Sequence, residues 1–156
     1  MTLDAALGAL EQVRLVVALR QSALVYPLVN SLHIVGIALL FGAIVPLDLR
    51  LIGWRRRAGA VDDVAALLLP VAITGLVLAV AAGMLLFATD ARGYAASTPF
   101  RVKLLLLSAA LLNAIALRFV PWQSAGPVGL RIRIAAAASI LLWLGVIVLG
   151  RLVGYS

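Results

Sequence analysis

Four long apolar stretches dominate the pattern of hydrophobic and polar positions along the chain. They cover about residues 25–47, 65–89, 103–120 and 133–150. Each is long enough to cross a bilayer as a helix, which takes roughly 20 mostly apolar residues. Because lipid cannot satisfy backbone polar groups, apolar spans of this length are typical of helices. The pattern predicts an all-α integral membrane protein, a four-helix bundle.

The segment before the first span has a different periodicity, because its apolar and polar residues fall on opposite sides of a helical wheel. The apolar side holds Leu3, Leu7, Leu10, Val13 and Val17, and the polar side holds Asp4, Glu11 and Gln12. This predicts a short amphipathic helix, over about residues 3–20, that lies along the outer membrane surface. Acidic residues stand where a signal peptide would be basic, so the segment is expected to remain in the mature protein. Residues 1–156 are predicted to form one transmembrane domain.

The composition supports this fold and excludes several classes of protein. The chain is 65% hydrophobic and 12% charged, with a mean hydropathy of +1.17. A soluble domain could not keep so much apolar surface away from water. Cysteine is absent, which excludes disulfides, iron–sulfur clusters and thiolate metal sites. The sequence also lacks a phosphate-binding loop, an HExxH motif and a nucleophile elbow, which argues against a hydrolase and leaves open whether the protein is an enzyme.

Basic residues set the expected orientation. Arg50 and the run Arg55, Arg56 and Arg57 follow the first span, and loops rich in arginine tend to stay in the cytoplasm. With four spans, both termini then lie on the outer, periplasmic side. The net charge is +7, but the basic residues are dispersed at the ends of the spans. This distribution favours contact with anionic lipid headgroups of the bilayer and argues against nucleic acid as a partner.

Polar residues inside the spans are the candidates for function, because each is costly in hydrocarbon unless it has a partner. Tyr26, Asn30 and His33, the only histidine, follow an i, i+4, i+7 spacing that places them on one helix face. At about 1.5 Å per residue, one uncommon side chain on each of the four spans lies roughly 9–15 Å from the outer end. These four are His33, Met84, Asn113 and Trp143. We predict that they meet around one site.

Such a site has three interpretations. His33 is a suitable ligand for haem b or copper, together with Met84 or with a second His33 in a two-fold dimer. Arg101, Lys103 and Arg151 would then neutralise haem propionates. Alternatively, His33 hydrogen-bonds to Asn30, Asn113 or the Trp143 indole and fixes the helix register. The third interpretation is a path for protons or substrate.

Two further patterns are read as structural. Asp48, next to Arg50 and at the level of Arg118, predicts an ion pair at the inner membrane edge. Gly75, Ala79 and Gly83 recur every four residues and predict a face where a neighbouring helix approaches closely.

Three segments carry a resemblance to a known family. "YPLVNSLHIVGIALLFGAIVPLDLRLIG", "PFRVKLLLLSAALLNAIAL" and "LLWLGVIVLGRLVGY" resemble an uncharacterised bacterial family of small four-helix membrane proteins, a domain of unknown function. The chain is more distantly similar to the membrane domain of copper-resistance D-type proteins, through His33 and Gly36. The resemblance implies a bacterial cytoplasmic membrane and brings no established activity. The positions that fit the family pattern are His33, Gly36, Gly42, Asp48, Arg50, Gly53, Lys103, Asn113, Trp143, Gly150 and Arg151.

Two functional hypotheses follow from the sequence. The first is a haem- or copper-binding membrane component for electron transfer or metal handling, built on His33. The second is a non-catalytic accessory or scaffold subunit, in which the intramembrane polar residues hold helices or a partner together. Both hypotheses are compatible with a homodimer or a larger membrane complex.

Overall fold

The computed structural model describes residues 2–54, 61–119 and 128–154, and its regular secondary structure is helical throughout these ranges. The helices are α1 (Leu3–Glu11), α2 (Arg14–Gln21), α3 (Val25–Ile52), α4 (Val61–Thr89), α5 (Ala91–Ala96), α6 (Thr98–Arg118) and α7 (Leu130–Val153). The predicted all-α fold is therefore confirmed. The arginine run at 55–57 lies outside the described residues.

The four long helices α3, α4, α6 and α7 correspond to the four predicted spans. Each is long and apolar enough to cross a membrane, so the chain is a multi-pass membrane protein. The helices begin or end a few residues beyond most of the expected limits. At 1.5 Å per residue, the 28 residues of α3 extend about 42 Å, whereas the hydrocarbon core is about 30 Å thick. The ends of α3 therefore reach past the hydrocarbon.

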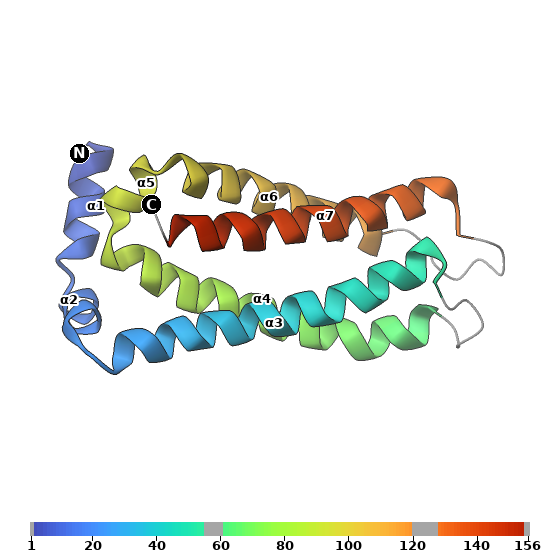
Figure 1. Cartoon of the computed structure of the whole chain (residues 1–156), viewed down its shortest axis with the longest axis horizontal. Coiled ribbons are helices and arrows are strands. Elements are labelled where there is room, and N and C mark those ends of the chain that lie inside the picture. Colours follow the sequence, from blue (N-terminus) through green and yellow to red (C-terminus); the bar gives the residue numbers. More distant parts are fainter. Residues whose placement is uncertain (1, 55–60, 120–127, 155–156) are drawn as a thin grey trace.

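The long helices form two pairs (Figure 1). α3 packs along α4, α6 packs along α7, and the pairs join where α3 meets α7. Over the described residues, α4 and α6 form no comparable contact with each other. The bundle is therefore closed along α3 and α7 and more open between α4 and α6.

Small residues set the distance between α3 and α4. A Cβ atom at Gly36 would lie 2.5 Å from the backbone nitrogen of Ala79, and one at Gly75 would lie 2.7 Å from the carbonyl oxygen of Gly36. Real Cβ atoms do not approach other atoms so closely, so only glycine fits at both positions. The predicted small-residue face on the second span is confirmed as a packing face for α3.

Two short helices cross one end of the bundle, which we call the cap end (Figure 1). The opposite end, where α3 and α6 finish and α4 and α7 begin, is the loop end. α1 contacts α5, and Asp4 forms an ion pair with Arg92, with an oxygen–nitrogen distance of 3.3 Å. Glu11 accepts a hydrogen bond from the Arg92 backbone nitrogen at 2.9 Å. The described chain begins and ends at the cap end.

The N-terminal segment differs from the single helix expected over 3–20. The chain is extended at Val13, which divides the segment into α1 and α2. This break changes which face is buried, because Val16 and Leu19 pack inward whereas Leu3 and Val13 stay exposed. A single helical wheel could not predict this, since it assumes one continuous rotation.

Candidate functional site

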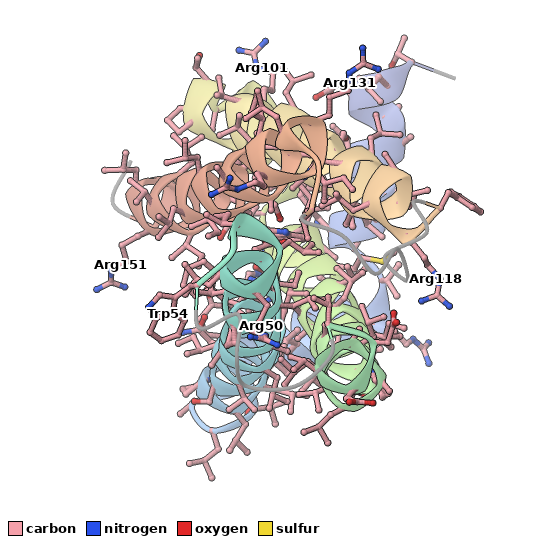
Figure 2. The ribbon with its side chains drawn as sticks, turned by 90° about the vertical axis from the view of Figure 1, so that its right-hand side faces the viewer. Arg50, Trp54, Arg101, Arg118, Arg131 and Arg151 are labelled. Carbon is pink, nitrogen blue, oxygen red and sulfur yellow. The ribbon has the colours of Figure 1, made fainter. Side chains whose placement is uncertain are left out.

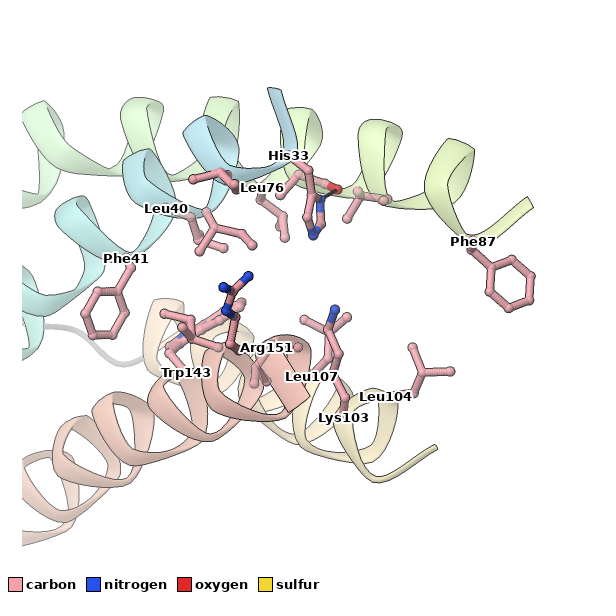
Figure 3. Close-up of a pocket in the computed structure, with 18 of the residues that line it drawn as sticks. His33, Leu40, Phe41, Leu76, Phe87, Lys103, Leu104, Leu107, Trp143 and Arg151 are labelled. Carbon is pink, nitrogen blue, oxygen red and sulfur yellow. Dashed lines mark hydrogen bonds between the residues drawn. The ribbon is translucent and has the colours of Figure 1, made fainter. Parts of the chain in front are cut away.

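A cavity of about 570 Å³ lies between the two helix pairs, in the half of the bundle nearer the cap end (Figure 3). All four long helices contribute to its walls, which are mostly apolar. The polar groups in the walls come from Asn30, His33, Lys103, Trp143 and Arg151. Among the described residues, no carboxylate lines the cavity. Its volume is within the range that holds small ligands and cofactors.

His33 projects from α3 into this cavity (Figure 3). Its Nδ1 atom lies 2.7 Å from the carbonyl oxygen of Ala79 on α4. Because a carbonyl oxygen only accepts, Nδ1 must carry the hydrogen, and Nε2 keeps its lone pair. Metal-ligating histidines are usually held in this way, with one nitrogen bound to a protein acceptor and the other free for the metal.

Gly83 provides the space for the imidazole. A Cβ atom at this position would lie 2.9 Å from Cε1 of His33. The three small residues of α4 therefore have two roles, because Gly75 and Ala79 admit the α3 backbone and Gly83 admits the ring of His33. Together with the hydrogen bond from Nδ1, this contact fixes the plane and direction of the imidazole.

Two cationic side chains from the opposite pair of helices belong to the cavity lining, Lys103 of α6 and Arg151 of α7. Lys103 extends from α6 toward His33, and its Nζ packs beside Gly150, 3.2 Å from where a Cβ atom would be. In the described part of the chain, Lys103 forms no hydrogen bond or ion pair. Arg151 of α7 is exposed, and its guanidinium lies at the outer edge of the bundle (Figure 2). Because the described residues of the walls include these cations and no carboxylate, they favour an occupant with anionic groups.

Trp143 forms part of the cavity wall on the loop-end side. Its side chain is only 4% exposed and packs with Leu40, Ala43, Ala72 and Ala110. Within the described residues, its Nε1 atom is buried and has no hydrogen-bond acceptor. A buried N–H without an acceptor is unfavourable, and an acceptor on a molecule in the cavity would relieve this.

The structure brings together three of the four residues that were expected to meet. His33, Met84 and Trp143 line the cavity, but Asn113 does not. Its Nδ2 atom instead donates to the carbonyl oxygen of Ala135, at 3.0 Å, and so joins α6 to α7. The expectation for Asn113 was wrong because depth along a helix does not fix rotation about its axis. Met84 is 67% exposed and belongs to the same helix pair as His33.

An aromatic cluster closes the cap end of the cavity. Phe87 of α4, Tyr94 of α5 and Phe100 of α6 stack with ring centroids 5.3–6.2 Å apart, and both phenylalanines line the cavity. Tyr26 does not line it, but forms a hydrogen bond with Tyr94. Burial raises the pKa of Tyr94, and the neighbouring Tyr26 and Asp90 raise it further. The cluster was not predicted, although the spacing of aromatic residues around the short α5 is a signal for it.

The expected ion pair at the other membrane edge does not form. Asp48 and Arg50 are both buried, but Asp48 has no ion pair within the described residues and hydrogen-bonds to Ser139 of α7. Arg118 is exposed and points away from the bundle (Figure 2). Arg101 also lies outside the cavity, and its Nη2 donates to the carbonyl oxygen of Ala96 at 3.1 Å. Of the three expected partners for propionates, only Lys103 and Arg151 belong to the cavity lining.

Comparisons with known proteins add no family to this description. No family model, no curated protein and no solved structure matches the chain.

Proposed function

We propose that the protein is a haem-b-binding component of a bacterial cytoplasmic membrane, in which His33 would hold the iron through Nε2. The observation that carries this proposal is the orientation of His33. Its Nδ1 is bound to Ala79, and the ring enters a cavity of about 570 Å³. Bound haem would supply one-electron redox chemistry, and its partners would be other membrane proteins or a second copy of the chain.

The donor set favours haem over a bare metal ion such as copper. The described residues contain no group of three or more His, Cys, Asp or Glu side chains that could hold a metal ion. A metal held by protein alone usually needs three or four ligands, whereas a porphyrin brings four nitrogen ligands with it. One well-oriented histidine is therefore enough for haem and too little for copper. Met84 is on the rim beside His33 and is not required.

The rest of the cavity matches the two chemical parts of haem. The apolar walls, which include Leu40, Leu76 and Leu107, suit the porphyrin ring. Lys103 and Arg151, which belong to the cavity lining, would bind the propionates, since charge-assisted hydrogen bonds to carboxylates are stronger than neutral ones. We place the cap end, with both termini, on the periplasmic side, because the arginine run at 55–57 favours the cytoplasm for the loop end.

The direct test is an absorption spectrum of the detergent-purified protein, oxidised and then reduced with dithionite, with elemental analysis of the same sample. We expect a Soret band that shifts on reduction, and iron in proportion to protein. A colourless, metal-free spectrum from folded protein, unchanged after haem is added, would contradict the proposal. It would favour the accessory-subunit hypothesis, in which the space between α4 and α6 receives a helix of a partner.

Replacing Lys103 with methionine is expected to weaken haem binding roughly tenfold to a hundredfold, because a charge-assisted hydrogen bond contributes about 1.5–3 kcal/mol. Haem titration into haem-free protein, followed in the Soret region, measures this. Arg101→Met is the matched control, since it removes the same charge two residues away on the same helix but outside the cavity. Equal losses in both variants would show that only the overall charge matters.

A further inference from the structure

A second buried polar site lies outside the cavity, between α3 and α7 near the loop end. Asp48 is 3% exposed and Ser139 is 2% exposed. The hydroxyl of Ser139 hydrogen-bonds to the carboxyl group of Asp48. The other carboxyl oxygen, Oδ2, is buried and has no hydrogen-bond partner in the described part of the chain. The proposed haem site uses neither residue.

Among the described residues, no positive charge pairs with this carboxyl group. On the helices around it, the charged side chains near the loop end are Asp62 and Asp63 of α4, Arg118 of α6, and Arg131 and Arg133 of α7. Among the residues that the structure describes, none of these pairs with Asp48 or interacts with it electrostatically. Arg133 donates to the carbonyl oxygen of Ile52 at 2.8 Å, and Arg131 points outward (Figure 2). Arg50, on the same helix, is rotated roughly 200° from Asp48.

We propose that Asp48 is a reversible proton-binding site. An ionised carboxylate buried without a counter-charge is far less favourable than the neutral acid. The neutral acid needs no cation, which agrees with the single hydroxyl partner found here. A metal cation would require more oxygen ligands than Asp48 and Ser139 provide. The ligand of this site is therefore a proton, which joins the carboxylate to form the acid and leaves again as the pH rises.

The position of Asp48 allows exchange with water. The residue is four positions before the end of α3, which corresponds to about 6 Å along the helix axis. Because α3 is longer than the hydrocarbon is thick, this turn is close to the membrane surface. Loss of the proton would leave a negative charge between α3 and α7. Ser139 and Trp143 are one turn apart on α7, so the same helix face connects the proton site to the cavity wall.

Infrared difference spectroscopy of the membrane-reconstituted protein tests this proposal without reference to haem. The chain has six acidic residues, and the other five lie outside the spans or at their ends. We expect wild-type protein to show the carbonyl stretch of a protonated carboxylic acid near neutral pH. The band should shift in deuterium oxide and disappear reversibly as the pH is raised.

Two variants identify the group responsible. Asp48→Asn is expected to lack the band, and Asp63→Asn is expected to keep it, since Asp63 is exposed at the same end of the bundle. The proposal is overturned if wild-type protein shows no acid band, if the band persists in Asp48→Asn, or if it does not titrate. Should Asp48→Asn fail to fold, the deuterium shift and the pH titration of the wild-type band still decide whether a protonated acid is present.

Discussion

His33→Ala is expected to yield a folded protein without a Soret band. The substitution removes the imidazole whose Nε2 keeps its lone pair in the cavity, and no other histidine exists to replace it. The apolar walls and the cations would remain, but they do not bind iron. Haem affinity is expected to fall at least as much as metal affinity falls when groups that support a metal ligand are removed, which is about tenfold to a hundredfold. Absorption spectroscopy after purification measures it, with size-exclusion chromatography to confirm that the variant is folded.

Added imidazole separates loss of the ligand from loss of the fold. If His33 acts through its ring nitrogen, free imidazole should restore a Soret band to His33→Ala in the presence of haem. A second variant, Gly83→Ala, keeps the ligand but forces the ring to move, because its Cβ would lie 2.9 Å from Cε1 of His33. We expect weaker haem binding and an altered spectrum. Full haem content in His33→Ala would show that another group binds the iron and would refute the assignment.

Gly36→Ala is expected to destabilise the bundle, although a change from glycine to alanine inside a helix is normally favourable. The new Cβ atom would lie 2.5 Å from the backbone nitrogen of Ala79, and a backbone atom cannot rotate away as a side chain can. Overpacking of this kind costs about 1–3 kcal/mol, which corresponds to a fall in melting temperature of roughly 2–12 °C for a chain of this size. Moving α3 away from α4 should also stretch the hydrogen bond between His33 and Ala79.

Gly42→Ala is the matched control on the same helix. A Cβ atom at Gly42 would meet no other atom within 4 Å, so only the helix propensity should change. We expect an unchanged or slightly higher melting temperature, by up to about 1 kcal/mol of stability. Thermal unfolding followed by circular dichroism in one detergent compares the two variants. If both substitutions raised the melting temperature, the close contact between α3 and α4 would not exist as described.

The spans were predictable because hydrocarbon imposes one strict requirement, a long run of apolar residues, which the sequence shows directly. The small-residue face around Gly75 was predictable for a similar reason, since close helix contacts leave no room for larger side chains. The partners of individual polar residues were harder to predict. Asn113 and Arg118 were placed at the expected depth, but their rotation about the helix axis depends on how the helices pack.

The orientation of His33 could not have been predicted from side chains alone. Its partner is the backbone carbonyl of Ala79, 46 residues away, and every residue has such a carbonyl. Asn30, Asn113 and Trp143 were the expected hydrogen-bond partners of His33, because a sequence identifies polar side chains but does not show which backbone carbonyl lies nearby. Similarly, the partner of Asp48 was expected to be a charged group. The observed partner is the hydroxyl of Ser139, on a helix that is far away in the sequence.

Beyond the stacking of Phe87 on Phe100, the described residues of α4 and α6 do not pack together, and this opening determines how a molecule reaches the cavity. Val80 and Met84 on α4 and Leu104 on α6 line it and are exposed apolar residues, so its flank faces the acyl chains. An occupant would enter by lateral diffusion within the bilayer. Its uptake would follow its mole fraction in the lipid, and a molecule that partitions strongly into membranes would fill the cavity at a very low aqueous concentration. Lipid and detergent chains would compete for the same entrance, so the choice of amphiphile would alter the apparent affinity for any hydrophobic ligand.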